Sequence, residues 1–343
     1  MSKTIYYLGA GASFGKRDES KNILEGLPIV SEIPSHFDEF REFIYKADIP
    51  EDAIYTFHGY INVRGKDLAN EKLYMLNAMD ELRDRIQEHA TIDTYARKLY
   101  LIGDKWTLDK LKCILCLFFI WEQLGHKPDN RYDTFLANVL EAKTLTLPKD
   151  ISILSWNYDS QIEIAYSSYR KNPGLAIYEK NIQGQWPQLT SNGRIFKVNG
   201  SATLADGSVL QEIMNSKEIP IEAQLIHYYS YAVSDTSQLG IQFKTHLSFA
   251  WEDSKNQKNM NDSISATVKD AEQIVVIGYS FPFFNRETDR AIFDMMPNLK
   301  KIYVQDINAD SVIQSLSAVI PLDSKIKAVP VRDCTQFYLP AEL

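Results

Sequence analysis

The chain has 343 residues, of which 45% are hydrophobic and 24% charged, and its formal net charge is −8. This apolar content can build a core and excludes fibrous and disordered classes, while the length allows two domains or one core with large insertions. No basic run exceeds a pair such as Lys16-Arg17, so the sequence does not favour binding to nucleic-acid phosphates.

Short runs rich in apolar and β-branched residues recur along the chain and predict six strands. They are Thr4–Leu8, Ile151–Ser155, Ile195–Val198, Ile274–Ile277, Ile302–Val304 and Ile326–Val331. Helical patterns lie between them, at Leu68–Gln87, Leu108–Gly125, Tyr132–Leu145, Tyr158–Tyr169, Ser263–Asp270, Arg286–Met296 and Asp310–Val319. Apolar strands alternating with helices predict an α/β fold with a doubly wound, mostly parallel sheet of the Rossmann-like kind.

The uneven spacing of these strands predicts insertions into one core. Residues 1–30 and 146–343 are expected to form the sheet core, and residues 31–145, almost entirely helical in pattern, are too long for one crossover connection. Residues 201–270 form a second, mixed insertion with a strand-like run at Thr245–Trp251. The polar stretch Asp253–Asp262 predicts a mobile loop.

The number of cysteines and the length of the apolar runs indicate where in the cell the protein is expected. Three cysteines cannot make a complete disulfide framework and indicate a reducing compartment, so we expect a cytoplasmic protein. The apolar run Cys113–Trp121 is half as long as a membrane span, and Ile5–Leu8 is too short for a signal peptide. Cys113 and Cys116 have zinc-site spacing, but their apolar helical context lacks further ligands and favours core packing.

The first predicted strand runs directly into a turn of small residues. This turn is Gly9-Ala10-Gly11-Ala12-Ser13-Phe14-Gly15, and Gly26-Leu27-Pro28 follows. Small residues after a first parallel strand allow the backbone to approach a phosphate, although a turn that only packs a helix on the sheet is the alternative. Phe14 stands where the dinucleotide fingerprint has its third glycine, which disfavours an ordinary NAD dehydrogenase.

Polar residues also follow the second predicted strand. Asn157 could hold a ribose hydroxyl or an attacking water without adding charge, and Asp159 is either a site residue or a helix cap. Three later strands end in Asn199-Gly200-Ser201, Gly278-Tyr279-Ser280 and Asp306-Ile307-Asn308. Because ligands bind at the carboxyl ends of parallel strands, these junctions predict one shared crevice.

The ordered set of motifs resembles the sirtuin-like domains of prokaryotic antiphage systems, distant relatives of the sirtuin deacetylases. The G-A-G-x-S turn corresponds to Gly9, Ala10, Gly11 and Ser13, and its G-L-P to Gly26, Leu27 and Pro28. The N-Y-D, h-G-S, G-Y-S and D-x-N motifs begin at Asn157, Asn199, Gly278 and Asp306. Arg131-Tyr132-Asp133 and Ile92-Asp93-Thr94 also look like segments of the family's helical insertion.

This resemblance implies an NAD-binding fold that cleaves the bond between nicotinamide and ribose and depletes NAD during infection. The residues expected to contact NAD are Gly9, Ala10, Gly11, Ser13, Pro28, Gly200, Ser201, Gly278, Tyr279, Ser280, Asp306 and Asn308. The expected catalytic residues are Asn157, Asp159 and Asn199. The four-cysteine zinc module of the deacetylases is missing, so no metal is expected and NAD hydrolysis ranks above deacylation.

One departure from the family pattern affects the expected chemistry. Family members carry His where this chain has Asn199, and an amide cannot act as a general base. Either the two asparagines position water alone, or Asp159 or an inserted histidine supplies the base, or the chain is a catalytically silent sensor of NAD or ADP-ribose. We favour hydrolysis, with a homo-oligomer or a separate activating protein as partner and no membrane or nucleic-acid partner.

Overall fold

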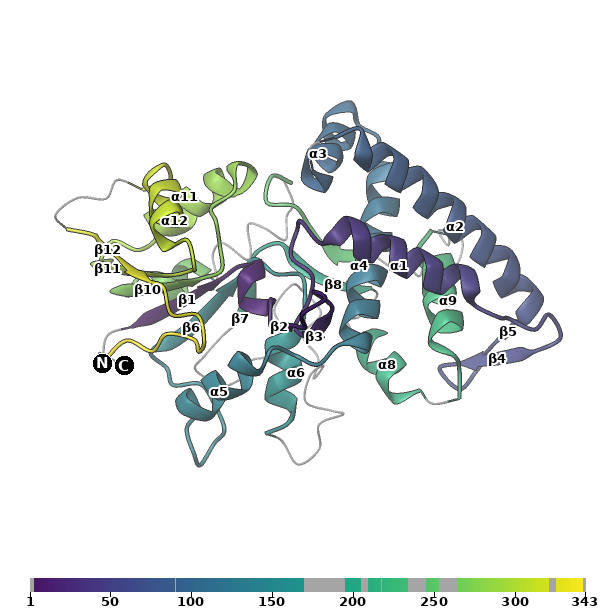
Figure 1. Ribbon diagram of the computed structural model, residues 1–343, viewed down its shortest axis with the longest axis horizontal. Coiled ribbons are helices and arrows are strands. Elements are labelled where there is room, and N and C mark those ends of the chain that lie inside the picture. Colours follow the sequence, from purple (N-terminus) through teal and green to yellow (C-terminus); the bar gives the residue numbers. More distant parts are fainter. Residues whose placement is uncertain are drawn as a thin grey trace. The chain divides into compact units, whose positions relative to one another are not determined.

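The computed structural model describes residues 3–89, 91–169, 195–204, 209–216, 218–233, 245–252, 264–320 and 325–341 (Figure 1). The chain divides into two compact units. Unit 1 comprises Met1–Ile29, His126–Ser201 and Ser248–Leu343, and unit 2 comprises Val30–Gly125 and Ala202–Leu247. The loop expected at Asp253–Asp262 lies outside the described residues.

Unit 1 is built on a six-stranded sheet in which every pair of neighbours is parallel. The strands are β1 (Thr4–Leu8), β6 (Ile151–Ser155), β7 (Ile195–Lys197), β10 (Gln273–Ile277), β11 (Lys301–Gln305) and β12 (Lys327–Val331). Their spatial order is β12-β11-β10-β1-β6-β7. Along the chain this is 6-5-4-1-2-3, the doubly wound order whose direction reverses beside β1, so the predicted fold class is confirmed.

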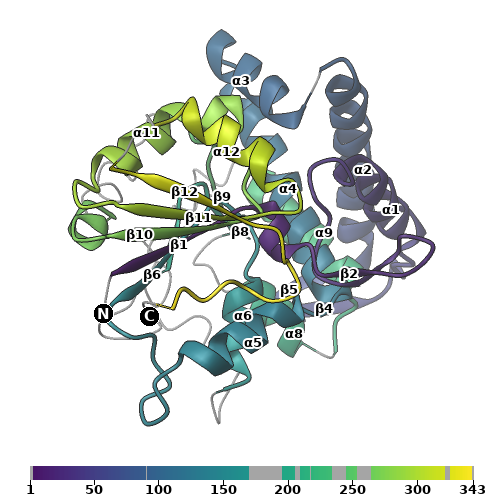
Figure 2. The same ribbon diagram turned by 60° about the vertical axis from the view of Figure 1, so that its left-hand side comes forward.

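Helices cover both faces of this sheet, as Figure 2 shows. They are α5 (Asn130–Val139), α6 (Gln161–Ser167), α11 (Arg286–Asp294) and α12 (Ala309–Ser317). Alternate residues of β1 point to opposite faces: Ile5 and Tyr7 join the core beneath α11 and α12, whereas Tyr6 and Leu8 join the core beneath α5 and α6. Burial on both faces explains the continuous apolar runs that predicted these strands.

Three short elements sit near the first turn of unit 1. A 3₁₀ turn, η1 (Ala10–Ser13), follows β1, and the small hairpin of β2 (Lys16–Arg17) and β3 (Ile23–Glu25) comes next. A second 3₁₀ turn, η3 (Phe283–Asn285), precedes α11. These elements carry the backbone away from the carboxyl ends of β1 and β10.

Unit 2 is mainly helical. Its helices are α1 (Ile33–Lys46), α2 (Gly65–Gln87), α3 (Ile92–Ile102), α4 (Lys105–Gly125), α8 (Val209–Asn215) and α9 (Ile221–Val233). The strands β4 (Ile54–Phe57) and β5 (Ile61–Arg64) pair as an antiparallel hairpin, which the helical pattern did not predict. Strand β8 (Gly200–Leu204) starts at the end of unit 1 and pairs with β9 (Thr245–Leu247).

The unit boundaries differ from the insertion predicted at residues 31–145. Helix α5 groups with the sheet because Tyr132, Phe135 and Leu136 pack in the same core as Tyr6 and Leu8. Residues 202–247, expected to form part of a separate mixed insertion, group with the helices of residues 30–125.

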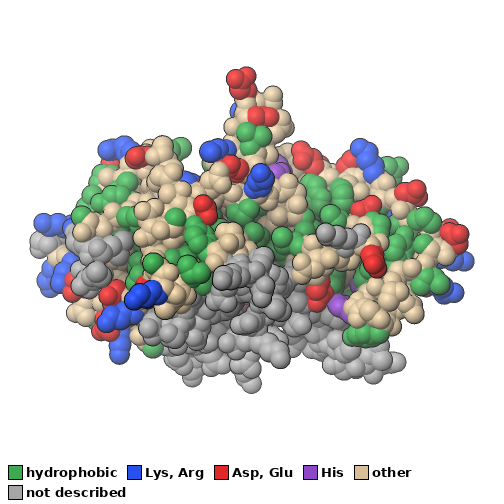
Figure 3. Space-filling model, turned by 90° about the horizontal axis from the view of Figure 1, so that it is seen from below, with side chains coloured by type: hydrophobic (Ala, Val, Ile, Leu, Met, Phe, Trp, Pro, Cys, Tyr) green, Lys and Arg blue, Asp and Glu red, His purple; other side chains and the backbone are tan. Residues whose placement is uncertain are grey.

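Helix α4 of unit 2, whose residues Leu111–Ile120 are all buried, carries both Cys113 and Cys116. Both thiols are buried, and burial raises the pKa of Cys113 well above its usual range and that of Cys116 to about 12. Within the described residues no helix is both long and apolar enough to cross a bilayer. On the face shown in Figure 3, the coloured acidic and basic side chains are interspersed rather than gathered by sign.

Candidate functional site

The turn after β1 packs directly against the turn after β10. A Cβ on Gly11 would lie 2.7 Å from the Cα of Gly278, and one on Gly278 (φ +58°) would lie 2.4 Å from Gly11. The Gly9 N–H donates to Ile277 O and the Gly11 N–H to Gly278 O, each at 3.0 Å. The amides of Gly9 and Gly11 are therefore used inside the protein. Backbone packing requires glycine at both Gly11 and Gly278, at the point where the strand order reverses.

Asn157 connects the end of β6 to this turn. Its Nδ2 donates to Gly9 O at 2.9 Å and to Ser13 Oγ at 3.1 Å, and the residue is only 7% exposed. Both amide hydrogens are thus committed, which fixes the orientation of the side chain and leaves Oδ1 as the atom that can face a ligand or a water. The Ser13 hydroxyl also bonds the buried Tyr132 hydroxyl at 3.0 Å.

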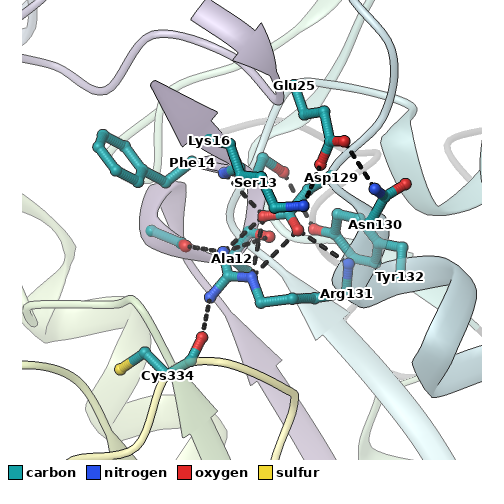
Figure 4. Close-up of polar contacts among 12 residues, drawn as sticks. Ala12, Ser13, Phe14, Lys16, Glu25, Asp129, Asn130, Arg131, Tyr132 and Cys334 are labelled. Atoms are coloured by element: carbon teal, nitrogen blue, oxygen red, sulfur yellow. Dashed lines mark hydrogen bonds and ion pairs between the residues drawn. The ribbon is translucent and has the colours of Figure 1, made fainter. Parts of the chain in front are cut away.

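An ion pair between Asp129 and Arg131 braces the same turn from α5 (Figure 4). The Arg131 guanidinium bonds both carboxylate oxygens of Asp129 and donates to Gly11 O at 2.8 Å and to Cys334 O at 3.3 Å. Asp129 in turn accepts from the Gly15 N–H at 2.7 Å. Arg131 was expected only as part of a segment that resembles the family, and its hold on the carbonyl side of the turn was not predicted from the sequence.

Asp159 lies one residue before Ser160, the N-cap of helix α6, so it is not the N-cap that the alternative interpretation predicted, although its side chain bonds the first helical residue. Its Oδ1 accepts from the Gln161 N–H at 3.0 Å, and its backbone carbonyl accepts from the Lys197 ammonium. Lys197 Nζ also lies 3.4 Å from Glu163 Oε1, and both side chains are at most 2% exposed. Burial raises the pKa of Glu163, while Lys197 opposes this shift. This buried pair was missed because its two residues come from separate elements.

Asn199 ends the β7 junction and is 7% exposed. Its backbone carbonyl accepts from the Ser248 N–H at 2.8 Å, but its side-chain Oδ1 is buried and has no hydrogen-bond partner in the described part of the chain. Gly200 follows in the left-handed region (φ +71°), and Ser201 is buried. An unpaired buried carbonyl is costly, so Asn199 Oδ1 is an acceptor that a ligand or water would satisfy.

Tyr279 belongs to the core rather than to an open crevice. Its hydroxyl donates to Asp289 Oδ2 at 3.0 Å, and its ring stacks on Trp156 at 5.3 Å. The Tyr7 hydroxyl also donates to Asp289. Burial raises the pKa of Asp289 to about 7, although both tyrosine hydrogen bonds lower it. Only the backbone of Tyr279 is left for a ligand, whereas the following Ser280 is exposed.

The last predicted junction forms a tight turn after β11. Asp306 Oδ1 accepts from the Asn308 N–H at 2.8 Å, and Asn308 is exposed at the start of α12. The preceding Gln305 is buried, and its carbonyl accepts from the Gly278 N–H at 3.2 Å. Asp306 and Asn308 are therefore joined to the glycine turn only through neighbouring backbone.

The remaining expected contact residues flank the first turn. Pro28 is buried, and the Leu27 N–H before it donates to Ser13 O at 2.7 Å. Ala10 is exposed at the start of η1. The structure thus links the β1 turn, Asn157 and Gly278 by direct contacts, and it places Asp159, Asn199, Asp306 and Asn308 at the carboxyl ends of the other strands.

Among the described residues, no group of three or more His, Cys, Asp and Glu side chains could hold a metal ion. A scan of protein-family models and a search of curated proteins find no match to this chain.

Proposed function

We propose that unit 1 binds NAD and hydrolyses the bond between nicotinamide and ribose. The observation that carries this proposal is the fixed orientation of Asn157. Two hydrogen bonds hold its side-chain amide at the carboxyl end of β6, against the turn that follows β1. Doubly wound sheets bind nucleotides at this edge, beside the strand where the order reverses. The unpaired Oδ1 of Asn199 is a second acceptor on the same edge of the sheet.

In the proposed reaction a water attacks C1′ of the nicotinamide ribose. The C1′–N bond breaks, its electron pair leaves with neutral nicotinamide, and the water loses one proton to give ADP-ribose. Asn157 Oδ1 accepts a hydrogen bond from this water and aims its lone pair, while Asn199 Oδ1 accepts from a ribose hydroxyl. The cationic leaving group departs readily, so the reaction depends chiefly on positioning.

The proton requires an acceptor. Asp159 is the nearest carboxylate along the chain to Asn157, and among the described residues the hydrogen bond to its side chain, from the Gln161 N–H, goes to Oδ1. We assign Asp159 Oδ2 this role, because Asn199 cannot titrate and His126 is the single histidine of unit 1. In the cell this activity would deplete NAD in response to infection, triggered by oligomerisation or by a separate activating protein.

The test is nicotinamide release from NAD by the full-length protein, measured by chromatography. Asn157→Ala should lower the rate about a hundredfold, the scale expected when a positioning contact is lost. Asn298→Ala is the matched control, because Asn298 is exposed and donates only to the carbonyl of Lys269. Unchanged release by Asn157→Ala would contradict the assigned role, and no release under any activating condition would contradict hydrolysis.

A second candidate is a nucleotide sensor without turnover. Two observations favour it: Asn199 stands where the resembling family has His, and one oxygen of Asp159 is already bonded to the Gln161 N–H. A sensor would gain thermal stability with NAD or ADP-ribose and release no nicotinamide. In that case Asn199→His should create measurable release, because it restores a titratable group at the site.

A further inference from the structure

A groove with a volume of ≈ 390 Å³ lies in unit 2 between α2, α4 and α9. Its lining includes two large aromatic side chains, Tyr74 and Trp106, which are 65% and 59% exposed. Exposed aromatic rings beside a groove mark a surface whose burial by a partner is favourable. The groove belongs to unit 2 and takes no part in the function proposed for unit 1.

The charges that line the groove are mainly negative. Glu71 and Glu81 come from α2, and Lys110 of α4, the single cation among the described lining residues, is already paired with Glu81 at 3.0 Å. Glu71 has no ion-pair partner among the residues that the structure describes. A cationic ligand would therefore be favoured over a neutral or anionic one.

Tyr229 of α9 supplies the third wall of the groove. It is 3% exposed, and its hydroxyl makes no hydrogen bond within the described chain. Burial raises its pKa, and Cys113, Glu71 and Glu81 raise it further, so the hydroxyl is neutral and the two carboxylates are near it. A hydroxyl without a partner on the wall of a groove is a place where an incoming N–H group would form a hydrogen bond.

We propose that this groove binds an arginine side chain presented by a partner protein. A guanidinium is planar, stacks on aromatic rings and offers several N–H donors, which matches Tyr74, Trp106, Glu71 and Tyr229 together. Lysine would provide the charge without the planar stacking surface.

The exposure of the aromatic lining favours a polypeptide as the source of this cation. Tyr74 and Trp106 are each more than half exposed. A free small cation would leave much of both rings in water, whereas the residues flanking an arginine in a protein segment would cover them. Trp, Tyr and Arg are also the residues that dominate binding energy in protein interfaces.

The test uses fluorescence anisotropy of a labelled hexapeptide of alternating Leu and Arg, titrated with the full-length protein. A twin peptide with citrulline in place of Arg keeps the shape and loses the charge. We expect saturable binding of the Arg peptide and binding at least about tenfold weaker for the citrulline twin. Trp106→Ala and Glu71→Gln should each weaken binding about tenfold, the size of a partly desolvated cation–π or ionic contact.

The matched control is Glu42→Gln, which removes an exposed carboxylate of α1 outside the groove and should change binding less than about twofold. Circular dichroism checks that each variant is folded. Absence of binding, equal binding of the two peptides, or unchanged binding by folded Trp106→Ala and Glu71→Gln would overturn the proposal. Displacement by spermidine at the same concentration as unlabelled peptide would also overturn it, in favour of a small polyvalent cation.

Discussion

Replacing Asp289 by Asn should remove a large part of the pH dependence of stability of unit 1. Asp289 is 0% exposed, and burial raises its folded-state pKa from 3.8 to about 7. The folded protein therefore holds a proton at pH values where the unfolded chain has lost it. The contribution of this group to stability is complete below pH 3.8 and is lost as the pH rises to about 7.

The size of the effect follows from the shift in pKa. A difference of roughly three between the pKa values of the folded and unfolded states corresponds to about 4 kcal/mol. The reference is the freely hydrated carboxyl of the unfolded chain, and this is an upper value because the folded structure can relax around the charge. Asn has nearly the same shape and does not ionise. The free energy of unfolding of Asp289→Asn should therefore change less between pH 4 and pH 8 than that of the wild type, by up to about 4 kcal/mol.

The measurement is denaturant unfolding at several pH values, followed by near-ultraviolet circular dichroism because Asp289 bonds Tyr7 and Tyr279. Asp310→Asn is the control, since Asp310 is an exposed member of a surface pair with Arg332 and should leave the pH profile unchanged. Parallel pH profiles for wild type and Asp289→Asn would refute the argument that burial dominates over the tyrosine hydrogen bonds.

Two further stability predictions test the packing around the site. Gly11→Ala should destabilise the protein by about 1–3 kcal/mol, because the new Cβ meets backbone at 2.7 Å, whereas Gly125→Ala, with nothing within 4 Å, should be nearly neutral in a thermal melt. Lys197→Met should cost about 3–5 kcal/mol by leaving Glu163 charged and unpaired, and the double variant Lys197→Met with Glu163→Leu should recover most of that loss in urea unfolding. Equal stability of the single and double variants would contradict the ion-pair argument.

The sheet could be predicted closely from the sequence because its strands are buried on both faces. Thr4–Leu8 and Ile151–Ser155 have the predicted bounds, and the other four strands differ from prediction by one residue at an end or at both. The turn of Gly9 and Gly11 and the side-chain turn that Asp159 makes with the Gln161 N–H also follow local rules that a sequence displays. Periodicity and turn chemistry are short-range signals, which explains why these predictions were accurate.

The contacts that organise the site were not predictable in the same way. Asp129 and Arg131 act on a turn over a hundred residues earlier, and Asp289 meets Tyr7 across the sheet core. Nothing in the local pattern of these residues distinguishes them from surface charges. Lys197 could have been found from the sequence. A lysine inside an apolar strand requires a buried partner, which here is Glu163.

The position of β1 in the sheet affects the order in which the chain can fold during synthesis. β1 emerges first, yet Thr4 pairs with Ile151 on one side and with Gln273 on the other. The ribosome must therefore deliver the chain as far as β10 before the middle of the sheet is complete, and until then the apolar strand β1 has at least one unpaired edge. Such delayed pairing exposes a nascent chain to aggregation, so production of this protein should improve when translation is slowed or when a chaperone that shields apolar strands is supplied.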